Sequence, residues 1–105
     1  GEEKRDHIYI NDLAQILSKL VVNNYFGTLN LATGKVLSFY DIAKTILSLT
    51  KKNLKKIVFL KRTSPMPHNG YRSFDISLLK KIFRTKKIES FKKNIKKDLL
   101  LYREL

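Results

Sequence analysis

Apolar residues recur three or four positions apart in four stretches of the chain, and each stretch predicts an amphipathic helix. A residue that can cap a helix stands at the start of each stretch, because its side-chain oxygen can accept a hydrogen bond from a free amide of the first turn. These capping residues are Asn11 or Asp12, Ser38, Asp75 and Ser90. The signal at Ser38 is reinforced by Asp41, which completes a capping-box pattern.

Three short runs of β-branched, aromatic and other apolar residues predict strands at 8–10, 28–32 and 57–60. Thr33-Gly34 follows the second run and predicts a turn. A long loop with two prolines covers 61–74, and a loop of that length in a compact domain is typically functional or disordered. The order of these elements predicts a small α/β fold with short strands and about four helices, formed by residues 1–105 as a single domain.

Composition narrows the class of protein. The chain has 105 residues, 43% of them hydrophobic, as in a globular domain. It contains no cysteine, so disulfides and thiolate chemistry are excluded, and a reducing compartment fits this composition. No apolar run approaches the roughly 20 residues of a membrane span. We therefore expect a cytoplasmic protein that does not associate with a membrane.

The net charge of +13 is unevenly distributed. Residues 1–50 hold five basic and five acidic residues, whereas 51–105 hold seventeen basic and four acidic ones. Such asymmetry is typical of a nucleic-acid surface, or of a protein in which lysine is simply the default solvated residue. Aromatic residues are interleaved with the lysines, namely Phe59, Tyr71, Phe74, Phe83 and Phe91. Most of them lie on apolar stripes, so we expect most of them to lie in the core. A small basic nucleic-acid-binding domain is therefore the alternative function, and the less favoured one.

The most specific motif is the segment 5–14, Arg-Asp-His-Ile-Tyr-Ile-Asn-Asp-Leu-Ala. It resembles the Arg-Asp-(aromatic)-(aliphatic)-(Tyr/His)-(aliphatic)-x-Asp-(aliphatic)-Ala segment of the extended short-chain dehydrogenase/reductases, the NAD-dependent nucleotide-sugar epimerases and dehydratases. Further segments are similar to that family in the same order: 27–34, 38–43 and 74–81. The resemblance implies the C-terminal, substrate-binding part of such an enzyme, lacking its Rossmann partner domain.

The resemblance also implies which residues contact the substrate. Similar enzymes hold the substrate pyrophosphate between the arginine of Arg-Asp and a second arginine from the later loop. These roles fall to Arg5 and to either Arg62 or Arg72, because 61–72 lacks the family's Arg-Pro-Gly-Asp. Arginine suits the task, since its planar guanidinium donates two parallel hydrogen bonds. Tyr9 or Tyr71 is a candidate for the sugar or base, and His68 for a further substrate contact, in each case beside a purely structural alternative.

The cofactor and the catalytic residues are expected elsewhere. In the family NAD or NADP is held by a glycine-rich turn, and that Gly-x-x-Gly-x-x-Gly pattern is absent from this sequence. Tyr40 and Lys44 match the Tyr-x-x-x-Lys spacing of the family's catalytic pair, but they lie in the wrong helix. We therefore expect this chain alone to bind no cofactor and to be inactive.

The parent enzyme is expected to be an epimerase, a dehydratase or a reductase, with an N-terminal Rossmann domain and a nucleotide-sugar substrate. In the family, the strand that corresponds to 28–32 joins the sheet of the cofactor domain. Without that domain its edge is unpaired and can pair with another chain. We therefore expect either a homodimer formed around Leu29 and Leu31 or a marginally stable monomer.

Overall fold

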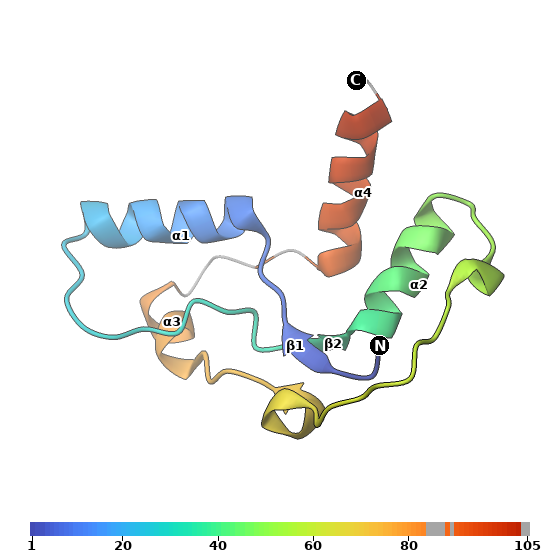
Figure 1. Cartoon of the computed structure of the whole chain (residues 1–105). Coiled ribbons are helices and arrows are strands. Elements are labelled where there is room, and N and C mark those ends of the chain that lie inside the picture. The colour runs from blue at the N-terminus through green and yellow to red at the C-terminus, as the bar shows by residue number, and fades with distance from the viewer. Residues whose placement is uncertain (84–87, 89, 104–105) are drawn as a thin grey trace.

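The computed structural model describes residues 1–83, 88 and 90–103. Its elements form an α/β arrangement of four α-helices, two 3₁₀ turns and three short strands within the described residues (Figure 1). In chain order they are β1 (Lys4–Asp6), α1 (Ile10–Val22), β2 (Val36–Ser38), α2 (Phe39–Leu49), η1 (Leu54–Lys56), η2 (Pro67–Gly70), β3 (Tyr71–Arg72), α3 (Ser77–Ile82) and α4 (Phe91–Arg103). The predicted fold class is therefore confirmed.

A small mixed sheet occupies the centre, in the order β2-β1-β3. Strand β1 pairs antiparallel with β2, which places Arg5 opposite Leu37. It pairs in parallel with β3, which places Arg5 beside Arg72. The helices α1, α2 and α4 extend away from this sheet, and α3 lies below α1 (Figure 1). The sheet thus brings together three segments that are far apart in the sequence.

The predicted strand at 8–10 is wrong. The paired residues are the preceding Lys4–Asp6, and Ile10 is already the first residue of α1. Tyr9 has an extended backbone and occupies the N-cap position without a side-chain cap, while its carbonyl accepts the hydrogen bond of the Leu13 amide at 3.0 Å. Because the helix begins at this point, the apolar run is divided between a short extended link and the first helical turn.

The predicted strand at 28–32 is also wrong, because this segment is held by side chains instead of a backbone ladder. Its Asn30 amide donates to the Asp75 carbonyl at 3.1 Å. In the turn that follows, Gly34 has φ +73°, and a Cβ there would lie 2.7 Å from the side chain of Ile76. The turn at 33–34 therefore packs against the start of α3, and the strand edge expected around Leu29 and Leu31 is not formed.

The capping predictions at Ser38, Asp75 and Ser90 hold better, whereas the cap predicted at Asn11 or Asp12 is wrong, because both residues lie inside α1. The Ser38 hydroxyl accepts the Asp41 amide at 3.0 Å and donates to the Asp41 carboxylate at 2.7 Å, so α2 begins with the expected capping interaction. Asp75 stands one residue before the N-cap of α3, and its carboxylate accepts both the amide and the hydroxyl of Ser77. Helix α4 begins directly after Ser90, as predicted.

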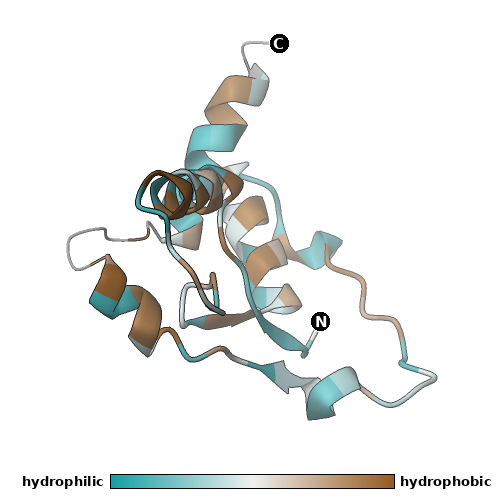
Figure 2. Ribbon diagram, turned by 90° about the vertical axis from the view of Figure 1, so that its left-hand side faces the viewer, coloured by the Kyte–Doolittle hydropathy of each residue, from teal (hydrophilic) through white to brown (hydrophobic). Residues whose placement is uncertain are grey.

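The third predicted strand, 57–60, is irregular in the structure. Its apolar side chains lie in solvent, with Val58, Phe59 and Leu60 exposed by 78%, 69% and 89%. Figure 2 shows this stretch as hydrophobic chain that runs apart from the helices. None of the three strands formed by the described residues pairs with it. The loop that follows is more ordered than expected, because 61–74 contains η2 and β3.

The described residues bury little apolar surface. Their buried hydrophobic side chains are Ile16, Ala32 and Leu79. The radius of gyration is 16.5 Å, whereas a compact domain of this size has about 13 Å. Large hydrophobic side chains are exposed along the length of the described chain, including Val22 at the end of α1 and Phe26 after it. The fold thus leaves extensive apolar surface without cover from the described part of the chain.

Candidate functional site

Two of the predicted substrate-binding arginines are neighbours in the sheet. Arg5 in β1 and Arg72 in β3 are directly paired residues of parallel strands. Paired residues lie on the same face of a sheet, so the two side chains originate about 5 Å apart. Adjacent like charges destabilise a sheet unless an opposite charge or an acceptor compensates them. Anionic or carbonyl groups near these two arginines are therefore needed to offset the repulsion between their charges.

Glu3 supplies part of that compensation. One of its carboxylate oxygens accepts from Arg5 at 3.4 Å, and the other accepts from Arg62. The Glu3 side chain is 15% exposed and that of Arg5 is 20% exposed, whereas that of Arg62 is 40% exposed. The carboxylate thus bridges Arg62, from the irregular segment before η2, to the arginine of the sheet.

The η2 turn provides the remaining acceptors. The Pro67 carbonyl accepts from the Arg5 guanidinium at 3.2 Å, and His68 Nε2 contacts the Arg72 guanidinium. His68 and Asn69 both have φ of +52°, in the left-handed region that residues other than glycine rarely adopt. Such strain persists only where surrounding contacts enforce it, and it is concentrated at functional sites. Here the strained turn carries two contacts to arginines.

We refer to Glu3, Arg5, Arg62, His68 and Arg72 as the arginine cluster. It contains three guanidinium groups and one carboxylate, so positive charge is in excess. Since both Arg5 and Arg62 donate to Glu3, their donors converge on the position of one oxyanion group. A diphosphate presents acceptors of this kind in larger number, and guanidinium groups bind phosphate with paired, charge-assisted hydrogen bonds. The cluster is therefore chemically suited to a phosphorylated ligand.

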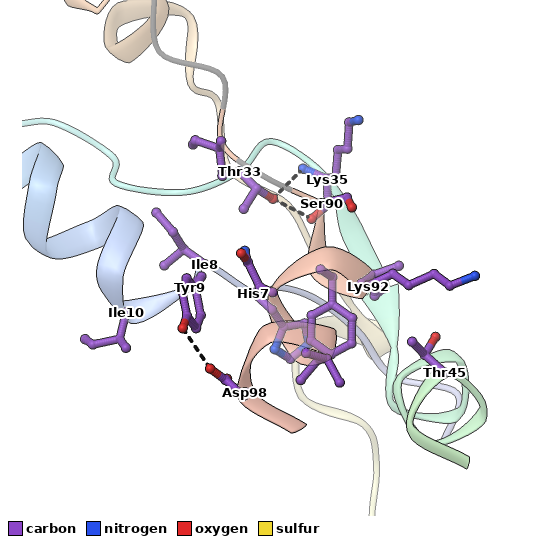
Figure 3. A pocket seen from close by; sticks show the side chains of 15 residues that line it. His7, Ile8, Tyr9, Ile10, Thr33, Lys35, Thr45, Ser90, Lys92 and Asp98 are labelled. Carbon is purple, nitrogen blue, oxygen red and sulfur yellow. Dashed lines mark hydrogen bonds between the residues drawn. The ribbon is translucent and has the colours of Figure 1, made fainter. Parts of the chain in front are cut away.

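Tyr9 lies apart from the cluster, in a cavity of about 590 Å³ beneath α4 (Figure 3). Its hydroxyl donates to the Asp98 carboxylate at 2.7 Å and accepts from the Asn11 amide at 3.2 Å. The hydrogen bond to Asp98 raises the pKa of the Tyr9 phenol above its usual value, because the neutral phenol is the donor. Tyr9 therefore joins the start of α1 to α4.

Two of the residues that line the cavity are close to Arg5 in the chain or in the sheet. Leu37 lines it, and Leu37 is paired with Arg5 across β1 and β2. His7, two residues after Arg5, also lines it. Since extended chain advances roughly 3.3 Å per residue, the backbone at His7 is roughly 7 Å from that at Arg5. The arginine cluster and the cavity are thus adjacent regions of one surface.

Tyr40 and Lys44 are placed as a packing pair. The Tyr40 ring lies 5.5 Å from the Phe59 ring, and Lys44 Nζ lies over the Tyr40 ring at 5.4 Å from its centroid. Lys44 also approaches Asp41 at 4.0 Å. In this arrangement the ammonium faces the aromatic ring, which is a cation–π contact.

The sequence analysis assigned no contact to Glu3, and it noted Asp6 only as part of the Arg-Asp motif. The Asp6 carboxylate accepts three hydrogen bonds from the turn at 33–34, which fixes that turn beside the sheet. Alternation along an extended strand places Glu3 and Arg5 on one side, and this signal could have identified Glu3. No comparable local signal exists for Asp6, because its partners are 27 and 28 residues away.

No group of three or more histidine, cysteine or carboxylate residues in the described part of the chain is arranged to hold a metal ion. The helices formed by the described residues include none with the length and apolar character needed to cross a membrane.

Comparison with known proteins supports a distant relationship. No family model matches the chain. ADP-L-glycero-D-manno-heptose-6-epimerase of Fusobacterium nucleatum subsp. nucleatum is similar to it, with 26% identity over 104 aligned residues. The match covers 91% of this chain and 31% of the epimerase, so the chain spans less than a third of that relative's length. The chain is thus distantly related, over a fragment, to a nucleotide-sugar epimerase.

Proposed function

We propose that this chain is the substrate-binding part of an NAD(P)-dependent enzyme that epimerises, dehydrates or reduces a nucleotide sugar. The observation that carries the proposal is the arginine cluster, in which Arg5, Arg62 and Arg72 come together around Glu3 and η2. In this proposal Arg5 and Arg62 bind the diphosphate, which takes over their hydrogen bonds to Glu3. Arg72, oriented by His68, extends the donor set.

The structure also bears on which of the two candidate arginines acts with Arg5. Arg62 and Arg5 both donate to the Glu3 carboxylate, and Arg72 is paired with Arg5 in the sheet. Both are therefore positioned to contribute. The loop at 61–72, which is longer than the corresponding loop of the family, carries both arginines in this chain. We assign each of them a contact to the diphosphate.

In this proposal the dinucleotide cofactor binds to another part of the parent enzyme. The glycines of this chain are Gly1, Gly27, Gly34 and Gly70, and none stands in a glycine-rich turn that leads into a helix. NAD or NADP is therefore assigned to another part of the parent enzyme.

The exposed apolar surface is consistent with a missing partner domain. Contiguous apolar surface of this kind typically marks an interface. Val58, Phe59 and Leu60 form one such exposed run, and Val21, Val22 and Phe26 form another around the end of α1. We propose that an N-terminal Rossmann domain covers part of this surface in the parent enzyme, and that a homodimer, if formed, uses it in place of the edge at 28–32.

The proposal is tested by calorimetric titration of the chain with ADP-glucose as a representative nucleotide sugar. Arg5→Lys keeps the charge but removes the fork of paired donors, and losing one charge-assisted hydrogen bond costs roughly 1.5–3 kcal/mol of binding. Lys19→Gln, in the last turn of α1, serves as a control that removes a charge outside the cluster. Equal affinity of the wild-type chain and Arg5→Lys would contradict the proposal.

A second candidate, single-stranded nucleic-acid binding, is favoured by one observation. Three of the aromatic residues in the basic half of the chain, Phe59, Tyr71 and Phe74, are 69%, 53% and 38% exposed. Exposed aromatic rings in a positive surface can stack on bases. Titration with an oligonucleotide at two salt concentrations distinguishes the candidates, because nucleic-acid affinity falls steeply with salt.

A further inference from the structure

The Glu3 carboxylate is bound by arginines through both of its oxygens. One oxygen accepts from Arg5 at 3.4 Å, and the other accepts from Arg62, which is 59 residues further along the chain. The Glu3 side chain is 15% exposed, whereas the neighbouring Glu2 is an exposed residue. In the ligand-free protein, a carboxylate of the chain itself therefore takes the position on which these two guanidinium groups converge.

The backbone around Glu3 is held independently of its side chain. The Glu3 carbonyl accepts from the Phe39 amide at 3.2 Å, and the Gly1 carbonyl accepts from the Tyr40 amide at 2.9 Å. The next residue, Lys4, is the first residue of β1 and is paired with β2. Rotation about the side-chain bonds of Glu3 is therefore sufficient to move its carboxylate out of the cluster, while the sheet and the start of α2 stay in place.

The two arginines depend on Glu3 to different extents. The Arg5 guanidinium also donates to the Lys4 carbonyl at 3.0 Å and to the Pro67 carbonyl at 3.2 Å, so it stays oriented when Glu3 moves away. Arg62, in contrast, is held among the described residues by its ion pair with Glu3. A ligand that displaces Glu3 therefore finds Arg5 in place, and it gains Arg62 as a second donor by breaking that ion pair.

We infer that Glu3 is an internal competitor, which occupies the diphosphate site of the empty protein and lowers its affinity for anionic ligands. The inference rests on the proposed function, because it takes a diphosphate as the ligand that displaces Glu3. A carboxylate offers a guanidinium the same paired acceptors as a phosphate, and its negative charge repels an incoming anion. Because it is attached to the chain, its effective concentration at the arginines is high. A ligand must therefore bring more charge or more acceptors than one carboxylate, and a diphosphate brings both.

The test measures the affinity for inorganic pyrophosphate by calorimetric titration of the wild-type chain and of Glu3→Gln, which removes the charge and keeps the size of the side chain. We expect Glu3→Gln to bind pyrophosphate about tenfold more tightly, equivalent to roughly 1.4 kcal/mol. Glu2→Gln removes the same charge from the exposed neighbouring residue. This control should stay within about twofold of the wild-type affinity, because salt screens an exposed charge. Arg5→Lys should weaken binding with either residue at position 3.

A measurement on the wild-type chain follows the carboxylate directly and does not require a folded variant. In carbon-13 nuclear magnetic resonance spectra, the Glu3 carboxylate signal should shift along the pyrophosphate binding curve, whereas that of Glu2 should stay fixed. Equal affinity of the wild-type chain and folded Glu3→Gln, or a Glu3 signal that stays fixed at saturation, would overturn the inference and leave the diphosphate site intact. Pyrophosphate binding that is insensitive to Arg5→Lys, or absent from both the wild-type chain and Glu3→Gln, would overturn the diphosphate site and the inference together.

Discussion

Replacing Asp6 with alanine should destabilise the fold more than any other single change to a carboxylate in the sheet region. The Asp6 carboxylate accepts from the Thr33 amide at 2.9 Å, from the Thr33 hydroxyl at 2.8 Å and from the Gly34 amide at 2.7 Å. Hydrogen bonds to a charged group contribute about 1.5–3 kcal/mol each, and water compensates part of this at the exposed Gly34 amide. We therefore expect a loss of roughly 2–4 kcal/mol in the free energy of unfolding.

Such a loss is large relative to the total stability of a domain, which is about 5–15 kcal/mol. Asp6→Asn should cost about half as much as Asp6→Ala. The side-chain oxygen of asparagine can still accept the hydrogen bonds from Thr33, but its NH₂ group cannot accept from the Gly34 amide, and the negative charge is lost. Urea unfolding followed by far-ultraviolet circular dichroism measures both changes. The midpoint for Asp6→Ala should fall by about 1–2 M, given slopes of about 1–3 kcal/mol per molar urea.

Glu2→Gln is the matched control, since Glu2 is an exposed carboxylate four residues earlier. It should change stability by less than about 0.5 kcal/mol, as is usual at a surface position. Hydrogen exchange of the Thr33 and Gly34 amides should also accelerate in Asp6→Ala. If Asp6→Ala were no less stable than the Glu2→Gln control, the interpretation of Asp6 as the anchor of the turn would be refuted.

Three further predictions concern the helix starts and Tyr40. Ser38→Ala should lower the free energy of unfolding by about 1 kcal/mol through loss of the α2 cap, and a wild-type urea midpoint would contradict this. Hydrogen bonds from Ser38 and Ser77 hold the pKa of Asp41 and of Asp75 below their usual values. Stability from these carboxylates is therefore present above about pH 4 and is lost as the pH falls through the lower pKa values of the folded state, and unfolding curves from pH 2 to 6 should show a smaller acid loss in Asp75→Asn. Tyr40→Phe should leave ligand binding unchanged, because the ring packs against Phe59 and the hydroxyl is not needed for that contact; a loss of ADP-glucose affinity in a folded variant would reverse this assignment.

Local signals in the sequence were sufficient where the structure is determined locally. The cap at Ser38 and the start of α4 after Ser90 depend on residues within one helical turn, and both were predicted. The strands could not be located in this way. Lys4–Asp6 consists of charged residues with low strand propensity, and it is a strand because β2 and β3, both distant in sequence, pair with it.

The same limit applies to the candidate site. The family resemblance singled out Arg5 and either Arg62 or Arg72, and the position of His68 in the long loop made it a further candidate. The fold brings these four residues together. The resemblance did not predict that Glu3 bridges two of them, because this contact depends on a residue 59 positions away. The cavity depends on α4 packing near the start of α1, so periodicity along either helix could not indicate it.

The most direct test of the central claim is to observe the arginine side chains during ligand binding. Nuclear magnetic resonance spectra of the Nε–Hε groups, recorded while ADP-glucose is added, report on each guanidinium separately. The diphosphate site predicts that the signals of Arg5, Arg62 and Arg72 shift together along one saturable curve, and that inorganic pyrophosphate competes for the same shifts. If these signals stayed fixed while amides of the lysine-rich segments η1 and α4 responded, the ligand would be bound by general positive charge and the proposed function would be contradicted.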